Sequence, residues 1–396
     1  MLRGDSHWSP IVLVSPAMRM SIRQLAWRLS ALALSGLLLS TAWVVSAAVP
    51  NRLTDEQFWN LSRNSSEEDG VFRSDNLLSN ETTFQWIIPG ILKTARQGRV
   101  YLGVGPEQNF TYMAALRPTM AFIIDIRHGN LDVQLLYKAI FEMSKDRAEF
   151  VSRLFSRRRP DGLTAQSSVA EIFTAVQAAE TSEAIYNDNL QAVQGYLTDT
   201  HHFPLSSGDR DGIAWALGNY YRFGPSISYN SSLSASAPPP IVGASTIGPR
   251  GGNAFTTYTS LMLSDDGQGL NRGFLATEEN FAFLKDLEAR NMVVPIVGDF
   301  GGPKAIRAVG TYLKSVDALV SAFYLSNVEQ FLVQGGTWRT FCESVATLPL
   351  DDASVFIRSG RGGPYTIGPT GNGVQNSSSA RMQPEIAPCL PARKDD

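Results

Sequence analysis

The chain has 396 residues, of which 43% are hydrophobic and 18% are charged, and its formal net charge is −3. This length is sufficient to bury a full core in one large or two smaller domains. The lack of a basic excess argues against a nucleic-acid-binding protein, because such a protein needs cations to neutralise phosphates. We therefore expect a globular protein whose partner is a small-molecule ligand and not a nucleic acid.

The N-terminal segment, residues 1–48, has the pattern of an export signal. Several arginines precede an apolar run from Leu29 to Val45, and the small residues Ser46 to Ala48 follow it. An uncleaved membrane anchor is the alternative, because a run of about 17 apolar residues is at the lower limit for a membrane span. The sequence thus predicts a protein that is exported (periplasmic or secreted) or anchored by this segment, and that meets a membrane only there.

Two cysteines, Cys342 and Cys389, are present in the whole chain. In an oxidising compartment they could form a disulfide that joins the C-terminal tail to the body, and two free thiols are an equally open alternative. The sequence contains no C-x-x-C and no H-E-x-x-H motif, so we predict no metal.

The stretch from Arg99 to Asn130 has the element order of a nucleotide-binding βαβ unit. A short apolar run, Val100 to Val104, is followed by a helical segment from Asn109 to Leu116, which Pro118 ends. A second apolar run, Met120 to Ile124, then stops at an acid. Strand, glycine turn, helix, strand and acid in this order indicate a Rossmann-like core.

The turn of this unit is the predicted ligand loop. Small residues let backbone N–H groups approach a polar ligand, and an acid at the end of the second strand can accept hydrogen bonds from ribose hydroxyls. The spacing from Gly103 to Asp125 is close to the expected value of roughly 20 residues. The glycine pattern is incomplete, because Glu107 occupies the place of the third glycine. The predicted cofactor-binding residues are Gly103, Gly105, Glu107, Asn109, Asp125 and Arg127.

Before this unit, Thr54 to Asn64 predicts a short helix with Thr54 as its N-cap. Residues 72–91 then alternate polar and apolar side chains. One interpretation is a loop that leads into a helix beginning near Ser79. The other is a polar lid over the ligand, with Ser79, Asn80 and Glu81 as substrate or lid residues.

Beyond the βαβ unit, residues 131–200 show helical spacing and predict a helical insertion after the second strand. Residues 226–256 are rich in Ser, Pro and Gly and predict a flexible loop. The fold domain is expected over residues 49–357. From residue 358 to 396 the chain is again rich in Gly, Pro and Ser, and we predict a tail that is disordered or loosely packed.

A second strand–helix block follows the flexible loop. Thr277 is placed as the N-cap of a helix, and Met292 to Val297 and Ala318 to Tyr324 read as buried strands. Buried strands that alternate with helices predict an α/β fold with a mostly parallel sheet flanked by helices. Asp299 follows the first of these strands and is a candidate catalytic residue, because ligands bind at the carboxyl ends of parallel strands. The alternative is a loop acid that caps a helix beginning at Pro303.

These two blocks resemble a family of uncharacterised bacterial proteins with a Rossmann core like that of class I S-adenosylmethionine-dependent methyltransferases. The resemblance covers about residues 54–357, excluding 226–256. It implies that Gly103 and Gly105 match two glycines of a G-x-G-x-G turn, and that Asp125 matches the acid that binds the ribose. Tyr101 stands where that family has an acid, and Asp299 lies near the motif after the fourth strand.

The resemblance implies a methyltransferase-like protein that binds a nucleoside-type ligand, with S-adenosylmethionine as the expected cofactor and Asp299 facing the transferred group. The alternative is an exported, non-catalytic binding protein whose Rossmann-like crevice holds a small polar metabolite. The incomplete glycine pattern and the export signal favour this second function.

Overall fold

The computed structural model describes residues 48–72, 74, 76–229, 231, 256–360 and 376–390. The predicted signal or anchor and most of the predicted flexible loop at 226–256 lie outside the described residues. In the part of the chain that is described, none of the helices combines the length and the apolar character needed to cross a bilayer.

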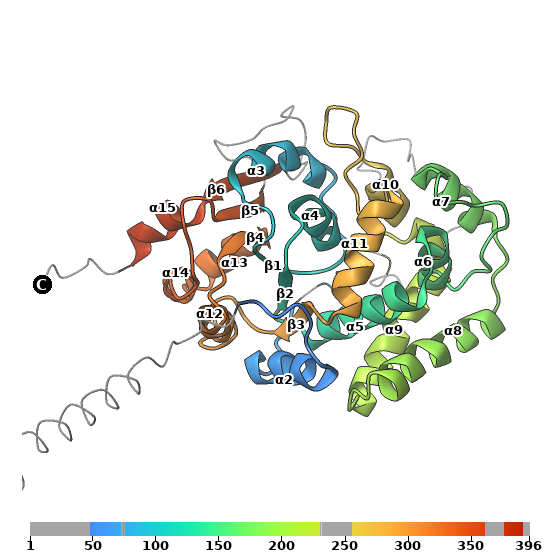
Figure 1. Ribbon diagram of the computed structural model, residues 1–396, viewed down its shortest axis with the longest axis horizontal. Coiled ribbons are helices and arrows are strands. Elements are labelled where there is room, and N and C mark those ends of the chain that lie inside the picture. Colours follow the sequence, from blue (N-terminus) through green and yellow to red (C-terminus); the bar gives the residue numbers. More distant parts are fainter. Residues whose placement is uncertain are drawn as a thin grey trace, which may run out of the picture. The chain divides into compact units, whose positions relative to one another are not determined.

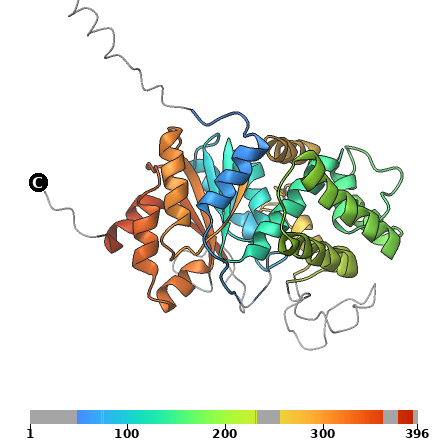
Figure 2. The ribbon, with the colours of Figure 1, turned by 90° about the horizontal axis from the view of Figure 1, so that it is seen from below.

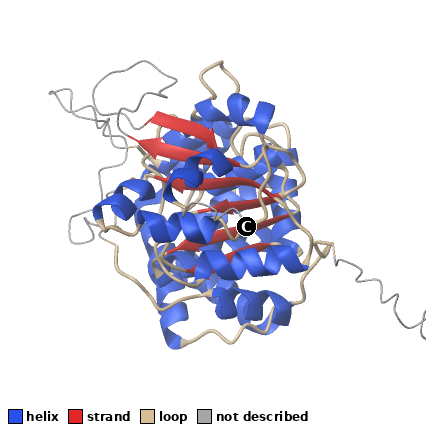
Figure 3. Cartoon of the chain, turned by 90° about the vertical axis from the view of Figure 1, so that its left-hand side faces the viewer, coloured by secondary structure: helices blue, strands red, loops and turns tan. Residues whose placement is uncertain are grey.

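A six-stranded sheet with the order β3-β2-β1-β4-β5-β6 forms the centre of the described fold (Figure 3). Strands β1 to β5 pair in parallel, and β6 pairs antiparallel with β5 at the edge. This confirms the predicted α/β fold with a mostly parallel, Rossmann-like sheet. The strands are β1 (Val100–Gly103), β2 (Met120–Asp125), β3 (Val293–Val297), β4 (Val320–Ser326), β5 (Val355–Gly360) and β6 (Asn376–Arg381).

Helices lie on both sides of the sheet (Figure 3), which explains why the central strands are continuous apolar runs. Every residue of β1, β2 and β3 is buried. One row of neighbouring helices consists of α2 (Asp55–Ser65), α12 (Ala305–Ser315) and α14 (Trp338–Val345). A second row consists of α3 (Ile88–Thr94), α4 (Gln108–Leu116), α11 (Glu278–Ala289) and α5 (His128–Met143) (Figure 1).

The helical insertion after β2 is longer than predicted. Helices continue past residue 200 through α9, which packs against α5, to α10. Figure 2 shows the green helices of this insertion at one end of the sheet, with the orange and red C-terminal helices at the other end. The further elements of the insertion are α6 (Arg147–Leu154), α7 (Val169–Ala178), α8 (Glu183–Gly195), η2 (Tyr196–Thr200), α9 (Ser207–Phe223), η3 (Gly224–Ser226) and α10 (Tyr258–Leu263).

Two helix starts agree with their sequence signals and two do not. Thr54 caps α2 in a capping box, and Thr277 caps α11. No helix begins near Ser79; a short 3₁₀ helix, η1 (Phe84–Ile87), precedes α3. Helix α12 begins at Ala305 and not at Pro303, because the chain from Gly298 to Lys304 forms a loop that the carboxylate of Glu67 holds.

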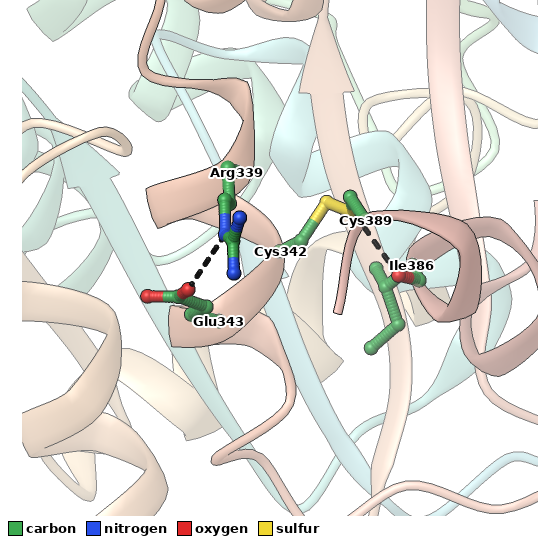
Figure 4. The surroundings of a disulfide bond; sticks show 5 residues. All are labelled: Arg339, Cys342, Glu343, Ile386 and Cys389. Carbon is green, nitrogen blue, oxygen red and sulfur yellow. Dashed lines mark hydrogen bonds and ion pairs between the residues drawn. A yellow bond between two sulfur atoms is a disulfide. The ribbon is translucent and has the colours of Figure 1, made fainter. Parts of the chain in front are cut away.

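The C-terminal tail is more ordered than its composition predicted. Residues 376–390 form β6, α15 (Met382–Ile386) and η5 (Ala387–Cys389), whereas 361–375 and 391–396 lie outside the described residues. Cys389 is joined by a disulfide to Cys342 of α14 (Figure 4). Of the two open alternatives for the cysteines, the structure therefore shows the bonded one, and the tail is fastened to the body as that alternative implies.

Candidate functional site

A pocket of about 760 Å³ opens at the carboxyl ends of four parallel strands. It is lined by Gly105 after β1, Asp125 at the end of β2, Asp299 after β3 and Ser326 at the end of β4. Strands β2 and β4 lie on opposite sides of β1, so the strand order reverses here. This reversal is the topological position at which open α/β sheets bind ligands.

Two segments form the walls above the strand ends. One is the polar segment formed by residues 71, 72, 74 and 76–81, and the other is α13 (Val328–Gln334) with the turn that follows it. The rings of Phe72 and Phe331, one from each wall, meet edge to face with centroids 5.2 Å apart. Ser79, Asn80 and Glu81 all line the pocket, so the predicted lid segment lies against the predicted ligand loop.

Asp125 and Arg127 form a buried ion pair in the pocket wall. The Oδ1 atom of Asp125 accepts hydrogen bonds from the backbone N and the Nε of Arg127, both at 3.0 Å, and Oδ2 accepts one from Nη2 at 3.0 Å. The Asp125 side chain is 5% exposed. An ionised carboxylate offers about four acceptor sites, so Asp125 keeps capacity for hydroxyl groups of a ligand while Arg127 fixes its orientation.

The turn after β1 is shaped by a buried amide. The Nδ2 atom of Asn109 donates to three carbonyl oxygens of the turn, those of residues 104, 105 and 106, at 3.0, 3.2 and 2.8 Å. Its Oδ1 accepts a hydrogen bond from the hydroxyl of Tyr101 at 2.9 Å. A Cβ on Gly103 would lie 1.9 Å from that Oδ1, and Gly105 has a φ of +78°. Gly103 and Asn109 therefore fix the shape of the turn without lining the pocket, whereas Gly105 is the glycine of the turn that lines it.

Glu107 is completely buried and does not line the pocket. Its two carboxyl oxygens accept hydrogen bonds from the backbone N of Ser79 at 3.1 and 3.2 Å. Burial raises the pKa of the Glu107 carboxyl to about 8, against the lowering effect of the Ser79 hydrogen bonds. Glu107 thus connects the start of α4 to the polar wall, a role different from the predicted contact with a cofactor.

Glu81 is the most enclosed acid of the pocket. Its Oε1 accepts hydrogen bonds from the hydroxyls of Tyr324 and Ser326, both at 2.6 Å. The Tyr324 hydroxyl in turn accepts a hydrogen bond from the Nε2 of Gln108. Burial raises the pKa of the Glu81 carboxyl, although the hydrogen bonds from Ser326 and Tyr324 lower it. The raised pKa favours the form of this carboxyl that carries a proton.

Asp299 is exposed and lies on the pocket side of the loop after β3. Its Oδ1 accepts a hydrogen bond from the backbone N of Gly301 at 2.8 Å. Glu67, not Asp299, occupies the N-terminal end of α12, where it accepts hydrogen bonds from the backbone N of Lys304 at 2.7 Å and of Ala305 at 2.9 Å. The alternative in which Asp299 caps this helix is therefore wrong.

Acidic groups outnumber basic groups among the described residues that line the pocket. Glu81, Asp125 and Asp299 are the acids, and Arg127 is the only base in that set. Most other lining groups with hydrogen-bonding side chains are neutral amides and hydroxyls. A pocket of this composition suits a neutral or cationic polar ligand better than one with several phosphates.

The pocket contains seven of the ten predicted site residues, together with some that the sequence analysis did not select. Gly103, Glu107 and Asn109 support the site from outside. Gln108, Tyr324 and Ser326 line it without having been predicted. The rule that selected Asp125 and Asp299, a polar residue at the end of a buried strand, also applies to the end of β4 and could have found Ser326. The lining residues from the prediction are Ser79, Asn80, Glu81, Gly105, Asp125, Arg127 and Asp299.

The part of the chain that contains this pocket matches one known protein family. A family model described as a domain of unknown function, DUF7790, matches residues 77–204 and 255–382. The chain belongs to this family. The two matched parts of the DUF7790 domain contain all six strands of the sheet and most of the pocket lining. A search of curated proteins found no match to the chain.

Proposed function

We propose that the DUF7790 pocket binds a nucleoside-type ligand and that S-adenosylmethionine is the first candidate. The observation that carries this proposal is the position of Asp125 at the carboxyl end of β2, facing the same pocket as Gly105 in the turn after β1. This is the arrangement in which an acid accepts hydrogen bonds from ribose hydroxyls while the turn adjoins the rest of the nucleoside.

The charge of the pocket supports the same ligand class. Asp299 and Asp125 provide negative charge, and Arg127 is already paired with Asp125. A sulfonium cation is attracted to such a site, whereas a diphosphate would be repelled by these acids and would find no unpaired base among the described lining residues.

In a methyltransferase-like reaction the protein mainly positions the donor and the acceptor, so no Ser-His-Asp set is required. Asp299 and Glu81 are the acids that would face the acceptor substrate. The two hydroxyl donors on Glu81 hold its carboxyl in one orientation, and burial raises its pKa, which favours the form that carries a proton. We therefore assign proton handling to Glu81 and substrate contact to Asp299.

The disulfide favours a second function. Disulfides such as Cys342–Cys389 persist in oxidising compartments, and S-adenosylmethionine is made in the cytoplasm. An exported DUF7790 protein would use the same pocket, without catalysis, to bind a small polar metabolite. The export signal expected in residues 1–48 agrees with this second function.

The experiment that separates the two functions is calorimetric titration of the chain without residues 1–48, with S-adenosylmethionine, S-adenosylhomocysteine and adenosine. For the first function we expect micromolar binding that Asp125→Ala weakens by about 1–3 kcal/mol, the contribution of a charge-assisted hydrogen bond. Asp188→Ala, an exposed acid on α8, is the matched control and should bind like the wild type.

Two results would contradict the proposal. Unchanged affinity in a folded Asp125→Ala variant would remove Asp125 from the ligand contacts. No heat with any of the three ligands, from wild-type protein whose circular dichroism shows a folded state, would reject the nucleoside site and leave the exported binding protein as the function to pursue.

A further inference from the structure

A second group of polar side chains lies outside the pocket, between α5 and α9. His128 is the first residue of α5, Asp132 lies one turn further along the same helix, and Asp209 is in the first turn of α9. The Nε2 atom of His128 is 2.6 Å from the Oδ1 of Asp209 and 3.7 Å from the Oδ1 of Asp132. These three ligand atoms all lie within 4.8 Å of one another.

The Asp132 carboxyl is incompletely satisfied. Its side chain is 4% exposed, and its Oδ1, the atom that points toward His128, has no hydrogen-bond partner among the described residues. A buried carboxylate oxygen without a donor is unfavourable unless a cation or another donor compensates it. Asp132 is therefore a buried carboxyl directed at the centre of the cluster, with a 3.7 Å ion pair to His128 but no hydrogen bond on that oxygen within the described part of the chain.

The packing of the two helices makes room for this carboxyl. A Cβ on Gly212 of α9 would lie 2.0 Å from the Oδ2 of Asp132. Any residue other than glycine at this position would push Asp132 away from His128 and Asp209. The second helix thus leaves space for an acidic group where an apolar contact would ordinarily form.

Negative charge around the imidazole exceeds what one histidine can balance. The Oδ1 of Asp69 accepts a hydrogen bond from the backbone N of His128 at 2.6 Å, so a third carboxylate lies beside the cluster. Asp209 uses its other oxygen, Oδ2, to accept a hydrogen bond from the backbone N of Ser206 at 2.7 Å, which fixes the orientation of that carboxylate. Three acids around one imidazole form an environment that attracts a cation.

We propose that His128, Asp132 and Asp209 bind a divalent transition-metal cation of the Zn²⁺ type. One imidazole nitrogen and two carboxylate oxygens form a mixed donor set that suits this class of ion better than Mg²⁺ or Ca²⁺, which prefer oxygen ligands alone. Ligand atoms of a tetrahedral Zn²⁺ site lie roughly 3.4 Å apart. The separations of 2.6 and 3.7 Å from His128 Nε2 lie on either side of that value.

Such an ion would connect two helices of the insertion. His128 directly follows Arg127, which pairs with Asp125 in the pocket, so the site would also hold the chain at the end of β2. The donor set leaves one tetrahedral position for water. The sequence analysis predicted no metal, because Asp209 lies 81 positions after His128 and no short motif relates them.

The test is metal titration of the purified full chain after treatment with a chelator. We expect Zn²⁺ to bind with about one ion per chain, Co²⁺ to give the visible absorption bands of a tetrahedral site, and Mg²⁺ to give no comparable heat. Asp132→Asn should weaken Zn²⁺ binding at least tenfold and abolish the rise in melting temperature that Zn²⁺ causes in the wild type. Asp211→Asn, an exposed acid on α9 close to Asp209, is the control and should behave like the wild type.

His128→Gln provides a second variant at a partly exposed position, in case the Asp132 variant does not fold. It should also lose Co²⁺ absorption and the Zn²⁺ effect on melting. No Zn²⁺ binding by folded wild-type protein would overturn the proposal. So would an unchanged affinity in folded Asp132→Asn or His128→Gln, because the cluster would then be an ordinary ion pair of His128 and Asp209.

Discussion

Glu107→Gln should make the protein more stable at pH 9 and leave its stability nearly unchanged at pH 4. Burial raises the pKa of Glu107 from 4.5 to about 8 in the folded protein. Between these two values the folded state keeps a proton that the unfolded state releases, so the free energy of unfolding of the wild type falls as the pH rises through this window. Glutamine cannot ionise, and its Oε1 can still accept the hydrogen bond from the backbone N of Ser79.

The size of this effect follows from the shift of the pKa. One pKa unit corresponds to about 1.4 kcal/mol, and relaxation of the buried site reduces the full amount, so we expect a gain of roughly 2–4 kcal/mol above pH 8. Urea denaturation of both proteins at several pH values measures it. Glu288, whose pKa burial also raises to about 8, adds a slope of the same sign to both proteins, so the difference between them isolates Glu107.

Glu56→Gln, an exposed acid of α2, is the control and should show no such pH-dependent gain. A difference between Glu107→Gln and the wild type that does not change between pH 4 and pH 9 would contradict the assignment. It would mean that Glu107 titrates alike in the folded and unfolded states.

Cys389→Ala should lower the free energy of unfolding by about 2–4 kcal/mol. The disulfide joins residues 47 positions apart, and a cross-link of that span removes a large part of the conformational entropy of the unfolded chain. Cys389 is the better position to change, because Cys342 is completely buried in α14. Denaturation with and without a reductant measures the effect.

The reductant supplies the matched control for this variant. It should destabilise the wild type by about the same amount as the substitution and leave Cys389→Ala unchanged, because no disulfide remains to be reduced. Equal stability of oxidised wild type, reduced wild type and variant would show that the cross-link contributes nothing to the folded state.

The core of the fold was predictable from local patterns. Buried parallel strands are continuous apolar runs, and Thr54 and Thr277 have the hydroxyl oxygen that caps a helix. The tail was not predictable in this way. Strand β6 has the sequence NSSSAR, with no apolar alternation, and it forms because it pairs with β5 and because the disulfide holds the segment after it. Both are long-range contacts, which composition does not report.

The site was predictable where a strand end determines the position of a side chain. Asp125 and Asp299 were found by that rule, and both line the pocket. The orientation of Glu107 was not predictable from the sequence, because it depends on how the wall segment at Ser79 packs against the start of α4. The cluster of His128 with Asp209 was missed for a related reason, since the packing of α5 on α9 brings the two together.

The position of Glu67 has a consequence for ligand choice. The first backbone N–H groups of a helix are where many α/β proteins hold a phosphate of their nucleotide. In this chain the first N–H groups of α12 already donate to the carboxylate of Glu67, which comes from the segment after α2. The protein supplies its own anion at that helix end. A ligand phosphate would therefore have to displace the Glu67 carboxylate before it could bind at the start of α12.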